Sequence, residues 1–142
     1  MNTETKVQQN EAIFRRVIDE VFNQGHYEVL PELFPSEFAE HQFDMAPNRA
    51  GLQSKVEWLR STFPDIHMTV EDITTDGDKV WARMRCRGTN TVGLMGPPNG
   101  KRYEITVFDL VRIEDGKIVE HWGVPDLFAQ MAQLGLLPQR QV

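Results

Sequence analysis

The chain has 142 residues, of which 40% are apolar and 25% charged, and its net charge at pH 7 is -6. These values are typical of one soluble globular domain with a small core, which we expect to span residues 1–142. The acidic balance, without clustered Lys or Arg, argues against a nucleic-acid-binding protein or one that binds anionic membranes.

Helical periodicity marks the first part of the chain. Between Glu11 and Gln24 apolar residues recur at the spacing of one helix face, and Gly25 is expected to end this helix. The following YEVLPELF contains a proline and can form only a short helix or a turn. Asn48 is expected to cap a second helix, which ends at FPD and carries the apolar stripe Leu52, Val56 and Leu59.

Between these helices, SEFAEHQF predicts a short strand. Side chains alternate across a strand, so its residues fall into two sets. One set is Phe38, Glu40 and Gln42, and the other is Ala39, His41 and Phe43. His41 could therefore face a pocket, or it could be a core histidine with a backbone partner.

After Pro64 the pattern changes to strands and turns. Residues 66–91 predict a hairpin around TDGD, VGLMGPPNGK is a Gly/Pro loop, and residues 102–124 predict a second hairpin around EDGK. LFAQMAQLG then predicts a short helix that stops at Gly135. Consecutive hairpins with helices grouped apart indicate an α+β fold in which helices cover one face of a curved sheet. Such a sheet is long enough to leave a cavity beneath the helices.

The last hairpin has two alternative registers. In the final strand Ile118, Glu120, Trp122, Val124 and Asp126 share one face, and His121 lies on the other. A two-residue turn at Asp115-Gly116 pairs Asp109 with Trp122, so that Asp109, Glu120, Asp126 and the indole share one apolar wall. A bulge at Gly116 shifts the register by one and places Asp109 with His121.

Asp126 also has two interpretations. It directly precedes the last predicted helix, where an aspartate caps backbone N–H groups. Alternatively its carboxylate faces the cavity, where burial would raise its pKa toward neutrality and suit it to acid/base catalysis. The two roles can also coexist.

The remaining chemistry-bearing residues predict no further site. The lone Cys86 excludes an internal disulfide and has no partners that would make it a nucleophile. No histidine pair has metal-ligand spacing, so we expect no metal. One face of a predicted strand carries Trp81, Arg83, Arg85 and Arg87, which alternate with apolar residues. This face predicts an outer surface that contacts solvent or another subunit, or alternatively an anion-binding stripe. The polar start MNTETKVQQNE has no signal-peptide core and no apolar run is long enough to span a membrane, so we expect a cytoplasmic protein.

Several motifs together resemble one known family. They are FPD, the GD.V..R strand, GT followed by a loop ending in GK, D..R..DGKI.EHW...D and a closing QLG. This combination resembles the SnoaL-like polyketide cyclases of the NTF2-like superfamily. The resemblance implies a cone-shaped α+β barrel, a curved antiparallel sheet wrapped around N-terminal helices, with a deep apolar pocket and usually a homodimer.

The resemblance also implies a chemistry. Members of the family close a ring by intramolecular aldol condensation, without metal, cofactor or covalent intermediate, and an aspartate serves as acid and base. The motif carries this role to Asp126, with the upstream His41 as a second catalytic candidate. Trp122 and His121 are carried over as pocket residues, and Asp109, Glu120 and Trp58 complete the substrate-binding candidates.

Three functional hypotheses follow from these observations. The first is a cyclase-type enzyme that acts on a hydrophobic carbonyl-bearing small molecule. The second is a non-catalytic small-molecule-binding protein of the same fold, or another lyase, isomerase or hydrolase of that superfamily. The third is a dimerisation module without a pocket.

Overall fold

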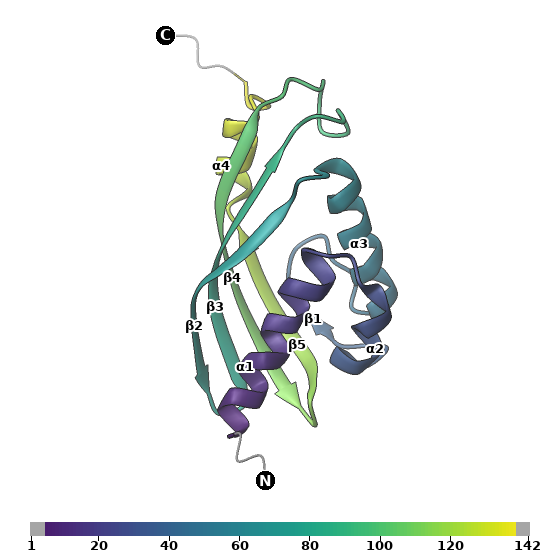
Figure 1. The fold of residues 1–142 in the computed structure, drawn as a ribbon, viewed down its shortest axis with the longest axis vertical. Coiled ribbons are helices and arrows are strands. Elements are labelled where there is room, and N and C mark those ends of the chain that lie inside the picture. Colours follow the sequence, from purple (N-terminus) through teal and green to yellow (C-terminus); the bar gives the residue numbers. More distant parts are fainter. Residues whose placement is uncertain (1–4, 139–142) are drawn as a thin grey trace.

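The computed structural model describes residues 5–138, and these form one curved five-stranded sheet covered by helices (Figure 1). The strand order is β1-β5-β4-β3-β2. The four long strands, β2 (His67–Asp76), β3 (Lys79–Thr89), β4 (Arg102–Glu114) and β5 (Lys117–Pro125), are antiparallel neighbours. The short β1 (Ala39–Glu40) adds to the free edge of β5 in parallel. The predicted α+β class is confirmed.

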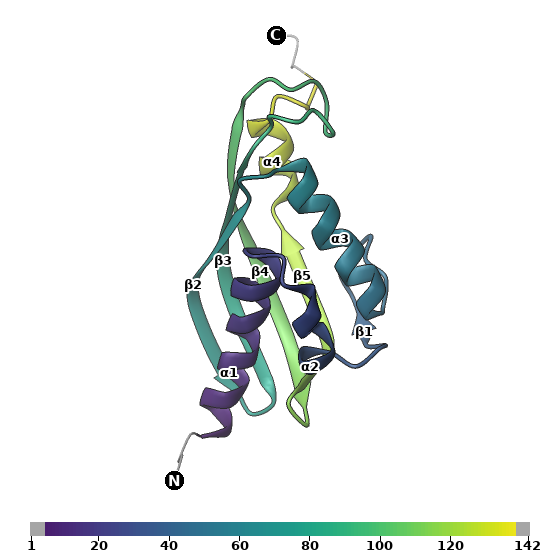
Figure 2. The ribbon, with the colours of Figure 1, turned by 45° about the vertical axis from the view of Figure 1, so that its right-hand side comes forward.

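The N-terminal helices lie together on one face of the sheet, as the views in Figures 1 and 2 agree. They are α1 (Lys6–Arg16), which continues as the π-helical segment η1 (Val17–Phe22), the short η2 (Tyr27–Val29) and α2 (Leu30–Leu33), and α3 (Arg49–Thr62). Their apolar faces and the inner face of the sheet form the core, which includes Phe14, Ile18, Val21, Val56, Val80 and Ile118. Burial of these faces is the main favourable contribution to folding.

The first helix begins earlier than its apolar pattern predicts. Thr5 and Gln8 form a reciprocal capping box, in which the Thr5 hydroxyl accepts a hydrogen bond from the backbone N–H of Gln8. The first turns project into solvent and carry polar residues, so hydrophobic periodicity does not detect them. The predicted cap of α3 is confirmed, since the Asn48 side chain accepts a hydrogen bond from the Gly51 N–H at 2.7 Å.

The last helix, α4 (Leu127–Gln133), lies at the end of the sheet where β4 begins, at the same end as the loop of residues 90–101 (Figure 2). That loop is held by Asn90, which is fully buried. The Asn90 side-chain N–H₂ donates to the carbonyls of Met95 and Pro97 and to Asn99 Oδ1, at 2.9–3.4 Å. These bonds join residues within the Gly/Pro loop, and the side-chain N–H₂ of Asn99 ties the loop to the body of the protein by donating to the Leu134 carbonyl at 3.0 Å.

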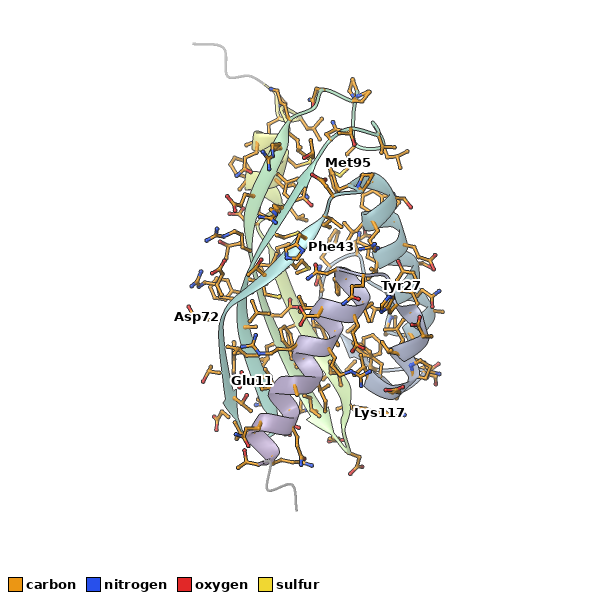
Figure 3. The ribbon with its side chains drawn as sticks, viewed as in Figure 1. Glu11, Tyr27, Phe43, Asp72, Met95 and Lys117 are labelled. Atoms are coloured by element: carbon orange, nitrogen blue, oxygen red, sulfur yellow. The ribbon has the colours of Figure 1, made fainter. Side chains whose placement is uncertain are left out.

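Strand alternation in β3 follows the sequence pattern. Val80, Ala82, Met84 and Cys86 are buried, while Trp81, Arg85 and Arg87 are exposed. Arg83 and Arg85 form ion pairs with Asp72, Glu71 and Glu104 on the neighbouring strands, at 2.6–3.3 Å. Figure 3 shows Asp72 on the side of the sheet away from the helices. The predicted outer surface is confirmed.

The register of the last hairpin combines features of both predicted alternatives. Asp115 and Gly116 both have positive φ, 49° and 76°, as in a two-residue type I′ turn, and Ile113 pairs with Ile118. However, Arg112 then pairs with Glu120, so Val119 is an extra residue that bulges from β5. Because a bulge exchanges the two faces of the strand beyond it, His121 rather than Trp122 joins the inner face.

Candidate active site

A cavity of about 310 Å³ lies between the concave face of the sheet and the helices. Its walls are mainly apolar and include Phe14, Ile18, Leu52, Ile105, Val107 and Ile118. Side chains therefore do not fill all of the space between the sheet and the helices. A cavity of this size and lining is typical of a binding site for a small hydrophobic molecule.

Three ionisable side chains meet on the cavity wall. The imidazole of His121, on β5, places its Nδ1 2.6 Å from Glu40 Oε1 of β1 and its Nε2 3.4 Å from Asp109 Oδ1 of β4. Only 14% of the His121 and Asp109 side chains and 1% of the Glu40 side chain are exposed. Glu40 Oε1 also accepts a hydrogen bond from the backbone N–H of Gln42 at 2.9 Å. We call Glu40, His121 and Asp109 the charged triad.

The charged triad is assembled by strand pairing. Glu40 and His121 are direct neighbours in the parallel β1–β5 pair, and the His41 N–H donates to the His121 carbonyl at 2.9 Å. Asp109 pairs with Gly123, which follows His121 on the inner face of β5. Each strand thus contributes one side chain to the same point of the cavity wall.

His121 is cationic at neutral pH. Burial by itself lowers the pKa of the imidazole, but hydrogen bonds and electrostatic attraction from Asp109 and Glu40 outweigh it and raise the pKa to about 10. Both ring nitrogens then carry protons, and Nδ1–H donates to Glu40 while Nε2–H points toward Asp109. The triad holds one positive and two negative charges inside a largely apolar cavity.

Gly123 makes room for this arrangement. A Cβ atom at this position would lie 2.2 Å from Gln42 Oε1, 2.7 Å from Asp109 Oδ1 and 2.8 Å from His121 Cε1. These separations are shorter than van der Waals contact, and the affected atoms belong to the polar side chains of the site. The absence of a side chain at position 123 therefore allows Asp109 and His121 to approach one another.

Of the residues predicted to form the site, three line the cavity: Asp109, His121 and Trp58. Asp109 and His121 are brought together, as the second register alternative predicted. Trp58 comes from α3 and is 42% exposed, and Lys55, which also lines the cavity, places its Nζ 5.0 Å from the centre of the indole ring. Exposed Phe43 and the loop residue Met95 also line the cavity, and Figure 3 shows both on the helix side of the sheet.

Of the two interpretations of Asp126, the structure confirms the helix cap. Asp126 is the N-cap of α4, where its Oδ1 accepts a hydrogen bond from the Ala129 N–H at 3.1 Å. The residue is exposed and is not among those that line the cavity. The carboxylate is thus engaged with the backbone of the helix it precedes, and this geometry favours a structural role over acid/base chemistry.

His41, Trp122 and Glu120 also lie outside the cavity lining, contrary to the predicted placement. The bulge at Val119 turns Glu120 and Trp122 to the outer face of β5. There the rings of His41 and Trp122 stack 4.5 Å apart, and His41 Nε2 lies 2.8 Å from Glu120 Oε2. Glu120 also accepts a hydrogen bond from Arg112 at 2.9 Å, and the bonds from Arg112 and His41 lower its pKa. These residues form a polar cluster on the outer surface.

Sequence reasoning missed Glu40 and Gln42, both of which line the cavity. The signal was present, because both alternate with Phe38, a core residue that is 7% exposed. The inner face of β1 is therefore the set that contains Phe38, and His41 belongs to the outer set. Which of the two sets faces the cavity could be decided only once the strand that pairs with β1 was known.

Residues 5–138 contain neither a candidate metal site nor a helix that could span a membrane. No group of three or more His, Cys, Asp or Glu side chains has a geometry suited to holding a metal ion in this part of the chain. No helix within it has the length and apolar character needed to cross a membrane.

Comparison with known proteins gives consistent matches. The sequence profile described as SnoaL-like polyketide cyclase matches residues 12–134. The aklanonic acid methyl ester cyclase DnrD of Streptomyces peucetius is 28% identical over 130 residues, which cover 87% of this chain and 88% of that protein. Because this match covers nearly the whole of both chains, it applies to the entire fold.

Solved structures agree with the sequence matches. IdmH of Streptomyces antibioticus, a proposed polyketide cyclase, is 33% identical with a TM-score of 0.81, and the match covers 89% of this chain and 99% of that one. TsrD of Streptomyces laurentii is 26% identical with a TM-score of 0.83, covering 94% of this chain and 100% of that one. The fold is therefore shared along the whole length of these neighbours.

Proposed function

This chain belongs to the SnoaL-like polyketide cyclase family, and from that premise we propose that it catalyses intramolecular aldol cyclisation of a hydrophobic small molecule with at least two carbonyl groups. The observation that carries the proposal is the charged triad of Glu40, His121 and Asp109 on the wall of an apolar cavity. Groups that are buried, charged and mutually paired in a cavity are typical of acid/base sites.

We assign the proton transfers to Asp109. Its carboxylate removes a proton from the carbon between or beside the carbonyl groups, which leaves an enolate. The enolate carbon bonds to a second carbonyl carbon of the same molecule, and that C=O π bond opens to an alkoxide. Asp109 then returns its proton to the alkoxide oxygen. Atoms, protons and electrons balance within one substrate molecule, and the scheme uses no cofactor.

His121 supplies positive charge at this point of the cavity. Its Nε2 is 3.4 Å from Asp109 Oδ1, so the imidazolium stabilises the carboxylate before proton transfer and the enolate oxygen after it. Glu40 accepts the Nδ1 proton at 2.6 Å and fixes the ring orientation. Because Glu40 is almost fully buried, its charge also keeps the imidazole protonated. We therefore treat Glu40 as a positioning residue.

The apolar cavity supports this chemistry in two ways. Exclusion of water strengthens the electrostatic interactions among Asp109, His121 and the developing enolate. The walls also hold a flexible substrate in a folded conformation, so that its two reacting carbons meet. Binding energy thereby offsets the entropy that the substrate loses when it folds.

The experiment compares Asp109→Asn with Asp126→Asn. Aklanonic acid methyl ester, the compound for which DnrD is named, is the first substrate to test, and chromatography separates the cyclised product from its isomeric precursor. We expect Asp109→Asn to lower kcat by roughly 10²- to 10⁴-fold and Asp126→Asn to leave it within a few-fold. If Asp109→Asn retains the wild-type rate on a substrate that the wild type cyclises, the proposed mechanism is refuted. Binding of the ester without conversion by the wild type would favour a non-catalytic binding protein.

We also propose that two copies of the chain associate through the outer face of the sheet. Two lateral rows run across β3, β4 and β5 on this face, Trp81–Leu110–Trp122 and Arg83–Phe108–Val124. Trp81, Phe108 and Val124 are 49%, 55% and 69% exposed. Exposed apolar rows with both charge signs around them suit a two-fold contact, in which each patch meets its own copy.

Light scattering on a sizing column tests the association. We expect the wild type to have twice the 16.4 kDa chain mass and Phe108→Lys to have the mass of one chain. Val7→Lys introduces the same charge at an exposed position of α1 and should leave the mass unchanged. A wild-type protein with the mass of one chain at all concentrations would contradict the proposal.

A further inference from the structure

The cavity has a second group of polar side chains, which the proposed reaction does not use. Tyr103 of β4, Gln130 of α4 and Cys86 of β3 all line it. They are only 2%, 6% and 7% exposed. The Tyr103 hydroxyl lies 3.8 Å from Cys86 Sγ, and the Gln130 side chain partly offsets the rise that burial causes in the pKa of the phenol. We call Tyr103 and Gln130 the distal pair.

The fold contains specific features that hold the distal pair in place. Tyr103 pairs with Gly88 across β3 and β4, and a Cβ atom at Gly88 would lie 2.8–3.0 Å from the phenol ring. The ring therefore packs directly over the glycine, and it contacts Phe63 edge-on with 4.8 Å between the ring centres. Gln130 projects from α4, and its backbone N–H donates to the carbonyl of Asp126, the helix N-cap.

The distal pair is far from the charged triad. Tyr103 and Asp109 both point inward from β4 and are six residues apart in the strand, which corresponds to roughly 20 Å along its backbone. The inward residues between them, Ile105 and Val107, are apolar. Along β4 the cavity wall is therefore polar at two ends and apolar in between.

The two ends also differ in charge. The triad carries ionised groups, whereas burial raises the pKa of the Cys86 thiol to about 11 and raises that of the Tyr103 phenol further above its ordinary value. Tyr103 is thus a neutral hydroxyl that donates one hydrogen bond, and Gln130 is a neutral amide. An amide makes more than one hydrogen bond, so Gln130 can contact Tyr103 and a ligand together.

We propose that Tyr103 and Gln130 form a distal subsite, which hydrogen-bonds an uncharged hydroxyl or carbonyl oxygen at the far end of an elongated, rigid and otherwise apolar ligand. The subsite selects ligands by length and by the presence of this oxygen. The opposite end of the ligand reacts at the charged triad. This part of the proposal rests on the proposed function, which assigns the reaction to the triad. Binding at the distal pair does not require turnover.

The experiment uses two anthraquinones as probes, emodin and chrysophanol. They share one rigid, apolar, carbonyl-bearing ring system, and emodin has an additional hydroxyl at its end. We expect calorimetric titration of the wild type to give about tenfold tighter binding of emodin, as one neutral hydrogen bond in a buried site provides. The conservative variants Tyr103→Phe and Gln130→Met should reduce this preference, and the double variant should bring the two Kd values to within about twofold.

Two control variants separate the causes. Ile105→Val changes the volume of the apolar section and should weaken both probes equally, so that the preference for emodin stays. Asp109→Asn should also keep the preference, which distinguishes a failure of the proposed reaction from a failure of the subsite. Equal Kd values for the two probes in the wild type, an unchanged preference in the folded double variant, or no binding of either probe would overturn the proposal.

Discussion

Asp109 and His121 meet inside the cavity with 3.4 Å between Oδ1 and Nε2, although a hairpin with regular pairing from its two-residue turn would place them on opposite faces. The single extra residue Val119 reverses the faces of β5 beyond it. The ion pair at the centre of the candidate site thus depends on a local irregularity of the strand.

The first prediction concerns Gly123, which lies opposite Asp109. Gly123→Ala would place a methyl group 2.7 Å from Asp109 Oδ1 and 2.8 Å from His121 Cε1, so the two side chains must move apart. We expect turnover to fall by roughly 10²-fold, because small displacements of reacting groups have large effects on rate. Steady-state kinetics and near-ultraviolet circular dichroism measure the effect.

Gly77→Ala is not a suitable control for this change, because Gly77 has a positive φ of 63°. Ala82→Gly, on the buried face of β3, changes one methyl group elsewhere in the sheet and should lower stability without a specific effect on kcat. An unchanged kcat in a folded Gly123→Ala variant would contradict the role given to the Asp109–His121 contact.

The second prediction concerns pH and the free energy of unfolding. The His121 pKa is raised from 6.5 to about 10 in the folded protein, since ionic partners outweigh burial. A raised folded-state pKa means that the imidazolium contributes its full stabilisation below about pH 6.5 and loses it as the pH rises through about 10. The stability difference between the wild type and His121→Asn should therefore decrease over this interval.

Urea unfolding of both proteins at several pH values tests this. The difference between the two is informative because it cancels the contributions of groups that do not interact with His121. A difference that is constant up to pH 10, or that grows, would contradict a cationic His121 in the folded state.

The third prediction separates the two interpretations of Asp126. Its carboxylate caps α4 through the Ala129 N–H. Asp126→Ala should lower the free energy of unfolding by about 1 kcal/mol, whereas Asp126→Asn, which also caps, should change it little. Chemical denaturation measures both. A variant Asp126→Asn that keeps its stability but loses turnover would return the catalytic role to Asp126.

The fourth prediction concerns the loop of residues 90–101. Asn90→Ala removes three side-chain hydrogen bonds and leaves the carbonyls of Met95 and Pro97 without this donor. We expect a loss of about 1–3 kcal/mol and faster proteolytic cleavage within the loop. Thr91→Ala changes the exposed neighbour and should have neither effect. Equal cleavage rates for Asn90→Ala and the wild type would show that the loop is held by other contacts.

Local sequence patterns predicted the structure correctly wherever a feature depends on a single helix or strand. The alternation of Trp81 and Arg85 with Val80 and Met84 predicted the outer and inner faces of β3, because that strand has no bulge between these residues. The cap at Asn48 depends only on residues within four positions of it. The motifs from FPD to QLG indicated the family, and the match to residues 12–134 confirms it.

Contacts between elements decided the site. Glu40 enters the cavity because β1 pairs in parallel with β5, and His121 enters it because Val119 bulges, and neither event is visible in the spacing of one strand. Asp126 looked suitable for catalysis on the assumption of a regular β5. Alternation along a strand determines which side chains share a face, but the pairing of that strand determines which face is buried, since burial is a property of the assembled sheet and its helices.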